Sequence, residues 1–499
     1  MALLPPQAEY DSRYAPFSIQ LGFIQLESND PLSGIKRIIL GNIVLPKQSI
    51  SVNNIDSLIE FKKLSSSPVE FFRDSLYAYV ITEFIKQSPD TTMAKSNLAV
   101  SLSRNNILRE RAIRFAKESY ASAQQRTVEE RSGAAGALGL TYYHLKQYEE
   151  SERYLSEAAR YAGPNESEIF FSLGDVKEKL GKKKEAFEVY ISGIGSSRPT
   201  SVYDRLLELK NELYPALTLD SIIVTRQAAA LQFTPDEFHR ERVELKKNEY
   251  QKVVLAELFT GSECRPCQAA DIAFDYLIER FKTSSLAILE YHIHIPQPDP
   301  LSNFDAEKRG EYYGVNSTPT AIIGGNTVIT SGGSKLAAKS KFFLYTDVIE
   351  RQLQSTSSVA ISLSAAIKKN ILTIRANAIA PSKNKTLKLR IAVVEDEVYY
   401  KGSNGIERHK FVVRKMLKSV DGFSFPKNGK LRINESLNIA KLTADLGKYY
   451  ELTNARFAQL GSGLKAKKNE IDIKRLAVVA FVQDDTTREI IQASVVKVE

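Results

Sequence analysis

Residues 253–281 read VVLAELFTGSECRPCQAADIAFDYLIERF, which predicts a strand, a turn and a helix in direct succession. The run 253–259 is almost continuously apolar, as expected for a strand that is buried on both faces. Gly261 begins a turn, and after Cys267 an apolar stripe follows at helical spacing, made of Ala269, Ile272, Ala273, Leu277 and Phe281. Two cysteines therefore lie between a buried strand and a helix.

Cys264 and Cys267 are the only 2 cysteines in the 499 residues. A bond between them would close a very small loop and add little stability, so we expect a chemical role. Cys264 would lie at the helix N-terminus, where the helix dipole stabilises a thiolate. Cys267, about one turn later, would be more buried. We expect Cys264 to attack a partner disulfide and Cys267 to resolve the mixed disulfide. Arg265 should favour the thiolate, whereas Glu263 should oppose it.

The same cysteines could instead be half of a zinc site. Two more ligands would be needed, and His292 and His294 are the candidates, because an H-x-H pair in a strand places both rings on one face. The strand–turn–helix context favours redox chemistry, so no metal is predicted. The two histidines are interpreted as outer-face polar residues, with proton shuttling by His292 as the alternative.

Residues 246–355 are expected to form one α/β domain. After the first strand and helix, a strand is predicted over 286–295 and a helix over 302–313. A hairpin follows, in which 320–323 and 327–330 flank the Gly-Gly-Asn turn at 324–326, and a helix over 341–354 closes the domain.

This pattern resembles the thioredoxin fold, in the strand–turn–CxxC–helix stretch and in Ser317-Thr318-Pro319-Thr320 just before the hairpin. The resemblance implies that Pro319 is cis and faces the cysteines, and that the Thr318 backbone pairs with the substrate chain. No Trp precedes the first cysteine, and the dipeptide between the cysteines is Arg-Pro rather than Gly-Pro. The family's buried strand acid has an approximate counterpart in Glu257, one residue out of register, which leaves proton transfer to Cys267 open.

The stretch 251–499 also resembles bacterial exported thioredoxin-fold proteins that carry a C-terminal all-β extension. The matching segments are 257–261, 312–315, 404–409 and 481–484. The resemblance implies the cell envelope, that is, the periplasm or secretion. The sequence as given begins without a signal-peptide pattern, so a lost leader would fit this location and a complete chain would be cytoplasmic.

Helices are predicted over 67–245, starting at the capping box Ser67-Pro68-Val69-Glu70. Within 94–200 the spacing resembles tetratricopeptide repeats, because two sets of small and large residues recur at an offset of 35. The first set is Leu138, Gly139, Tyr142, Ser151, Leu155, Ala158 and Pro164, and the second is Leu173, Gly174, Ala186, Tyr190, Gly193 and Pro199. An unrelated array of helical hairpins is the alternative. Residues 1–66 form an N-terminal segment of unclear fold.

Residues 356–499 contain seven short strand-like runs separated by Gly, Asn and Pro, which predicts a β-sandwich. The expected fold class is thus multidomain, with an α-helical repeat array, an α/β thioredoxin-like domain and a C-terminal β-sandwich. His409 and Arg414 in the last domain could bind an anion, although strand-face surface residues are the preferred interpretation.

Composition narrows the function classes. The net charge of +9 is small for this length, and no nucleic-acid-binding signature accompanies it, so no nucleic-acid partner is predicted. No apolar run approaches the roughly 18 residues that a bilayer span needs, and no integral membrane segment is predicted. No phosphate-binding loop or dinucleotide fingerprint is present, so no cofactor is predicted.

Two functions are consistent with these patterns. The first is a thiol–disulfide oxidoreductase that acts on protein substrates bearing thiols or disulfides, with Cys264 and Cys267 as catalytic residues and the helical repeats as a docking site. The second is a non-catalytic, repeat-based scaffold whose thioredoxin fold is a structural module. The intact CxxC together with Thr318-Pro319 favours the first.

Overall fold

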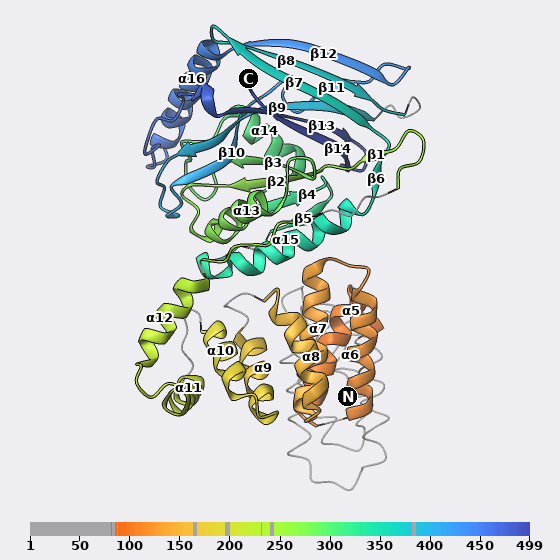
Figure 1. Ribbon diagram of the computed structural model, residues 1–499, viewed down its shortest axis with the longest axis vertical. Coiled ribbons are helices and arrows are strands. Elements are labelled where there is room, and N and C mark those ends of the chain that lie inside the picture. The colour runs from red at the N-terminus through yellow and green to blue at the C-terminus, as the bar shows by residue number, and fades with distance from the viewer. Residues whose placement is uncertain are drawn as a thin grey trace, which may run out of the picture. The chain divides into compact units, whose positions relative to one another are not determined.

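The computed structural model describes residues 81, 85–86, 88–106, 108–162, 167–194, 200–230, 232–239, 244–330, 332–381 and 386–499 (Figure 1). The expectations for the segment 1–66 and for the capping box at Ser67 lie outside these residues. The chain divides into two compact units between Leu219 and Asp220. Each unit has apolar clusters of its own. The structure is thus a multidomain protein with a helical part and an α/β part whose C-terminal region is rich in strands.

The first unit is helical in its described residues, with α5 (Thr91–Arg104), α6 (Arg109–Ala123), α7 (Val128–His144), α8 (Tyr148–Ala159), α9 (Ser167–Lys179), α10 (Lys183–Gly193) and α11 (Thr200–Leu213). Neighbouring helices pack in pairs, α5 on α6, α7 on α8 and α9 on α10. Side-chain caps fix two of the starts. Asp90 accepts hydrogen bonds from the first turn of α5, and Thr127 and Glu130 form a capping box on α7.

Close contact within two of these pairs depends on glycine. A Cβ on Gly139 in α7 would lie 2.7 Å from Leu155 Cγ in α8, and a Cβ on Gly174 in α9 would lie 2.5 Å from Tyr190 Cδ1 in α10. The same pairing therefore occurs twice at an offset of 35 residues, as the sequence spacing predicts.

The second unit starts with α12 (Leu219–Ala230) at the division and then alternates strands and helices. Up to residue 357 it contains β1 (Tyr250–Gln251), β2 (Val254–Thr260), α13 (Gln268–Arg280), β3 (Leu286–His292), α14 (Phe304–Tyr313), β4 (Thr320–Ile323), β5 (Thr327–Ile329), α15 (Ala338–Leu353) and β6 (Thr356–Ser357). The remainder contains β7 (Ala360–Lys368), β8 (Ile371–Ile379), β9 (Leu387–Tyr399), β10 (Arg408–Met416), β11 (Phe423–Ser424), β12 (Lys430–Asn438), α16 (Ile439–Ala458), β13 (Leu476–Asp484) and β14 (Ile490–Lys497).

One nine-stranded sheet runs through most of this unit in the order β14-β13-β9-β10-β3-β2-β4-β5, with β11 paired to β9. β3 is parallel to β2 along its whole length, whereas β10 joins the other edge of β3 through the pair Val412–Glu290. β7, β8 and β12 form a separate three-stranded sheet, and the short β1 pairs with β6. In Figure 1, α13 and α15 lie next to each other beside β2–β5, and they pack together.

Two apolar clusters share the strands β9 and β13. Ala392 of β9 and Val479 of β13 belong to the cluster that also contains β2, β3 and α14. Ile391 and Val478, one residue earlier on each strand, belong to the cluster under the three-stranded sheet. Because alternate residues face opposite sides of a strand, both faces are buried at these positions, which explains the apolar runs 391–394 in β9 and 476–482 in β13.

Two boundaries differ from the sequence-based expectation. The strands after residue 356 do not form a separate sandwich domain, because β10 pairs with β3 and continues the same sheet across the expected boundary at 355. The expected end of the helical region at 245 also lies inside the second unit, where the Phe233 ring packs against Tyr276 and Phe342. The 20-residue helix α16 was not predicted.

Among the described residues, no helix combines the length and the apolar character that crossing a membrane requires.

Candidate functional site

The cysteine turn is held between the end of β2 and the start of α13. Cys264 N donates to the Gly261 carbonyl at 2.9 Å, and Cys267 N donates to the Cys264 carbonyl at 3.0 Å. Cys267 has helical backbone angles and continues into α13. The two cysteines form a disulfide with a Cα–Cα distance of 5.3 Å. The strand–turn–helix arrangement predicted for this stretch is present.

Both cysteines are buried, so the expected difference in exposure between Cys264 and the more buried Cys267 is almost absent. The exposed fraction is 1% for Cys264 and 0% for Cys267. The residues between them, Arg265 and Pro266, are exposed and form the outer surface of the turn. The side of the turn that faces solvent is therefore formed by Arg265 and Pro266 rather than by sulfur.

The loop before β4 meets Cys264 as the sequence predicts. The Thr318–Pro319 peptide bond is cis, and the Thr318 carbonyl oxygen lies 3.6 Å from Cys264 Sγ. Thr318 is half-buried, and its hydroxyl donates to the Ile295 carbonyl at 2.8 Å. The Ile295–Pro296 bond is also cis, which the sequence analysis did not predict.

A third segment, residues 332–334, forms backbone hydrogen bonds with the cysteine turn and the first turn of α13. Gly333 N donates to the Pro266 carbonyl at 2.7 Å, and Ala269 N donates to the Gly333 carbonyl at 3.2 Å. A Cβ on Gly332 would lie 2.6 Å from the Pro266 oxygen and 2.8 Å from Pro319 Cδ. The approach of the turn, the Pro319 loop and this segment therefore leaves no room for a side chain at 332.

The loop between β9 and β10, residues 400–407, contacts the turn from the C-terminal region. Asn404 N donates to the Ser262 carbonyl at 3.0 Å, and the Asn404 side-chain amide donates to the Gly261 carbonyl at 3.3 Å. Ser403 Oγ donates to the Glu263 carbonyl at 3.3 Å. Sequence analysis did not find these contacts, because they join residues about 140 positions apart.

Glu263, which precedes Cys264, also contacts residues of the C-terminal region. Its carboxylate accepts a hydrogen bond from Tyr400 OH at 3.1 Å and forms an ion pair with Lys465. Burial acts to raise the pKa of Glu263, but the hydrogen bonds from Lys465 and Ser403 outweigh it and lower the pKa. The negative charge of Glu263 is therefore neutralised locally, whereas Arg265 stays exposed.

Glu257, the expected counterpart of the strand acid, lies on the opposite face of the sheet from α13. Its two carboxylate oxygens accept from Arg309 Nε and NH2, each at 2.9 Å, and one also accepts from Tyr313 OH at 2.6 Å. Arg309 belongs to α14, and Gln483 completes the buried network. Because the faces alternate along a strand, a position one residue out of register points away from the cysteine helix. Proton transfer to Cys267, which the sequence left open for Glu257, is therefore not a role that this carboxylate can fill from its position on Arg309 and Tyr313.

Asp271 is a buried acid in α13, the helix that follows the cysteines. It lies four residues after Cys267. Two residues at this spacing are neighbours on the surface of a helix, with Cβ atoms about 5–6 Å apart. Its carboxylate accepts from Thr260 Oγ1 at 2.7 Å and from the Asn404 amide at 3.3 Å. Burial raises the pKa of Asp271 to about 7. The sequence signal was an aspartate inside the apolar stripe of the helix, and sequence analysis passed over it.

His292 lies at the end of β3 and is buried rather than on an outer face. Its Nδ1 lies 3.0 Å from Asp299 Oδ2, which also accepts from Ser262 N. Its Nε2 has no hydrogen-bond partner among the described residues, and its ring packs edge-on against His409. Burial acts to raise the pKa of Asp299, but His292 outweighs it and lowers the pKa to about 2. Burial lowers the pKa of His409 to about 3.

The two alternative zinc ligands hold protein partners instead. His292 Nδ1 lies 3.0 Å from Asp299 Oδ2, and His294 Nδ1 accepts from Asp299 N at 3.0 Å while its Nε2 lies 2.9 Å from Tyr449 OH. In the part of the chain that the structure describes, no group of three or more His, Cys, Asp or Glu side chains is arranged to hold a metal ion.

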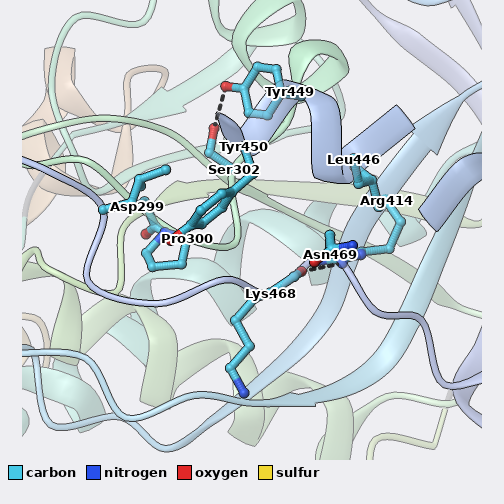
Figure 2. Close-up of a pocket in the computed structure, with 10 residues that line it drawn as sticks. Asp299, Pro300, Ser302, Arg414, Leu446, Tyr449, Tyr450, Lys468 and Asn469 are labelled. Atoms are coloured by element: carbon cyan, nitrogen blue, oxygen red, sulfur yellow. Dashed lines mark hydrogen bonds between the residues drawn. The ribbon is translucent and has the colours of Figure 1, made fainter. Parts of the chain in front are cut away.

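Arg414 and His409 are buried, so the surface-residue interpretation of this pair is wrong. Arg414 NH2 donates to the Lys468 carbonyl at 2.6 Å, and its Nε lies 3.1 Å from a Glu395 carboxylate oxygen. Figure 2 shows this guanidinium group at the edge of a small pocket. The pocket volume of about 10 Å³ suits a single water molecule, and it is lined by Asp299, Pro300, Ser302, Leu446, Tyr449, Tyr450, Leu464, Asn469, Arg414 and Lys468.

No family model and no curated protein matches this chain. Among solved structures it is similar to HBP35 of Porphyromonas gingivalis, with 16% sequence identity and a TM-score of 0.36, over 50% of this chain and 77% of that chain. A likeness of this size shows neither the fold nor the function of this chain.

Proposed function

We propose that this protein is a thiol–disulfide oxidoreductase of the thioredoxin-like type that acts on protein substrates through Cys264 and Cys267. The contact that carries the proposal is the 3.6 Å distance between Cys264 Sγ and the Thr318 carbonyl oxygen. This distance puts a backbone hydrogen-bonding group beside the sulfur that would react. A substrate chain that pairs with Thr318 as an added strand would bring its own sulfur to Cys264.

The reaction proceeds by two exchanges from the reduced protein. The Cys264 thiolate attacks a substrate disulfide, a mixed disulfide forms, and the first substrate sulfur leaves as a thiolate. Cys267 then loses its proton and attacks Cys264 Sγ, which releases the second substrate sulfur and forms the Cys264–Cys267 disulfide. The substrate disulfide is reduced to two thiols, and the protein dithiol is oxidised. The reverse sequence oxidises a substrate dithiol.

We assign Asp271 as the group that accepts the proton of Cys267 and later returns it. It lies one helical turn from Cys267, on the same side of the sheet, and burial raises its pKa to about 7. A carboxyl group with a pKa near neutrality can accept a proton in one half of the cycle and return it in the other.

Several arrangements support the family assignment within the proposal. The order β2, α13, β3, α14, β4, β5 and α15 is consistent with a thioredoxin-like domain in which the cysteines follow the first central strand. The repeated pairing at Gly139 and Gly174 supports tetratricopeptide-like repeats, which we assign to partner docking. We assign the protein to the cell envelope on the resemblance to exported thioredoxin-fold proteins alone.

The proposal is tested by trapping. The Cys267→Ala variant should form mixed disulfides with a disulfide-containing protein, because no second thiol can release the substrate. These adducts should disappear on reduction and should be absent from the Cys264→Ala variant, which is the matched control. Equal adduct formation by the two variants, or none by either, would reject the assignment of roles.

A scaffold without redox activity is the second candidate, and the burial of both sulfur atoms favours it. In that case the double variant Cys264→Ala, Cys267→Ala should retain every partner that the unmodified chain captures. Loss of thiol-dependent partners in the double variant would exclude the scaffold function as a full account.

A further inference from the structure

The exposed surface around the cysteine turn is rich in cations that come from separate parts of the chain. Arg265 belongs to the turn itself, and Lys335 opens the short helix Lys335–Ala337 before α15. Lys401 lies in the loop 400–407, and Lys465 follows α16. All four side chains are exposed.

Lys465 and Lys335 are linked to the turn by contacts, and Lys401 adjoins a residue that is. Lys465 pairs with Glu263, next to Cys264. Lys401 follows Tyr400, whose hydroxyl bonds the same carboxylate. A Cβ on Gly405 would lie 3.3 Å from the Gln268 amide nitrogen and 4.0 Å from Lys335 Nζ. Lys335 therefore meets the loop 400–407 beside the residue that follows Cys267.

The carboxylates of this surface do not balance the cations. Glu263 is buried and is neutralised by Lys465. Glu407 pairs with Lys401, and the nearby cations hold its pKa below the ordinary value, with Lys401 the largest cause and Arg408 and Lys335 adding to it. Arg265 has no hydrogen-bond or ion-pair partner among the described residues and follows Cys264 directly in the chain. The surface around the disulfide is therefore positive toward solvent.

We propose that this surface selects protein substrates whose reactive cysteine is flanked by aspartate or glutamate. The inference rests on the proposed function, and it adds the substrate class. A partner must pass Arg265 to reach the buried Cys264, so carboxylates next to its sulfur would be drawn in by Arg265, Lys335 and Lys401. Attraction of this kind raises association rates and is weakened by salt.

The test uses the reduced full chain and three synthetic cystine peptides of equal length, with two Glu, two Gln or two Lys on each side of the cysteine. Second-order rate constants for reduction are measured at about 0.01 M and about 1 M ionic strength, where the Debye length is about 30 Å and 3 Å. At low salt the Glu peptide should react about 10-fold faster than the Gln peptide, and the Lys peptide should be the slowest. At high salt the three rates should converge.

Charge-removing variants locate the effect. Lys335→Gln and Lys401→Gln should each lower the ratio of the Glu-peptide rate to the Gln-peptide rate by about 2- to 3-fold at low salt. Lys427→Gln, an exposed lysine near the three-stranded sheet, is the matched control and should leave this ratio unchanged. An equal change in all three variants would show a whole-protein charge effect and would overturn the inference.

The outcomes distinguish a failure of the proposed substrate class from a failure of the proposed function. If the Gln peptide is reduced by the Cys264 thiol but the Glu peptide has no advantage, the substrate class is wrong and the proposed function stands. If no peptide is reduced at either ionic strength, the proposed function fails, and the substrate class fails with it.

Discussion

Replacing Asp271 with asparagine should change how the stability of the second unit depends on pH. Asp271 is buried beside the cysteine helix, and burial raises its pKa from 3.8 to about 7. The folded state therefore keeps the Asp271 proton in a pH range where the unfolded chain has released it. Stability from this group is complete below about pH 4 and falls as the pH rises toward 7.

The magnitude follows from the shift. Each pKa unit corresponds to about 1.4 kcal/mol, so about three units give a penalty of roughly 4 kcal/mol above pH 7, of which about 2–3 kcal/mol develops between pH 5 and pH 8. Asparagine is neutral at every pH, but it cannot accept from both Thr260 and Asn404 as the carboxyl group does, which costs about 1 kcal/mol. The variant should therefore gain roughly 3 kcal/mol at pH 8 and far less at pH 5.

The assay is guanidinium unfolding of the full chain at pH 5 and pH 8, with hydrogen exchange of peptides from α13 reporting on the second unit. Asp299→Asn is the matched control. His292 lowers the pKa of Asp299 to about 2, against the opposing effect of burial, so its titration lies below both pH values. Its loss should therefore destabilise the unit at both pH values. Because the Asp299 charge helps to raise the pKa of Asp271, the dependence of stability on pH should weaken in this variant without disappearing. If Asp271→Asn and the unmodified chain lose stability in parallel from pH 5 to pH 8, Asp271 is ionised in the folded state and the reasoning is refuted.

Three further contacts can be tested by substitution. Gly174→Ala should destabilise the helical unit by about 1–3 kcal/mol, because the added Cβ meets the Tyr190 ring. Gly133→Ala is the control, and because nothing lies within 4 Å of its Cβ it should stabilise the unit by about 0.5–1 kcal/mol. Thermal unfolding of the two variants measures both changes. Arg309→Met should cost about 3–5 kcal/mol by leaving a buried carboxylate unpaired, and a urea midpoint equal to that of the unmodified chain would contradict this. In the reduced protein, Lys465→Met should shift the thiolate absorbance midpoint of Cys264 upward by about half a pH unit, while Lys465→Arg should restore it.

The local parts of the site could be predicted from the sequence. The turn at Cys264 and Cys267 depends on neighbours within a few positions, so an apolar strand, a glycine and a helical stripe were sufficient. The loop at Thr318 carries its own signal, a proline before a hairpin, and the structure places its carbonyl oxygen beside Cys264.

The parts that were missed depend on distant residues. The pairing of β10 with β3 joins Val412 to Glu290, and nothing in either strand encodes which edge it will occupy. The assignment of Glu257 failed through the parity of the strand, because a shift of one residue exchanges the two faces. Asp271 was passed over because an acid in an apolar stripe is recognised only when Thr260 and Asn404 are seen beside it.

The hydrogen bonds between β14 and the residues around the start of β2 affect the order in which the second unit can fold during synthesis. Gln492 accepts a hydrogen bond from Val253 N at 2.7 Å and donates to the Gln251 carbonyl at 2.9 Å, across a separation of 241 residues. At about 5–20 residues per second, a ribosome needs roughly 10–50 s to cover that distance. Through that interval the two cysteines have been synthesised while the strands that complete their sheet have not. The loop 400–407, which bonds the turn through Asn404, is also made during that interval, so the two sulfur atoms become enclosed only late in synthesis.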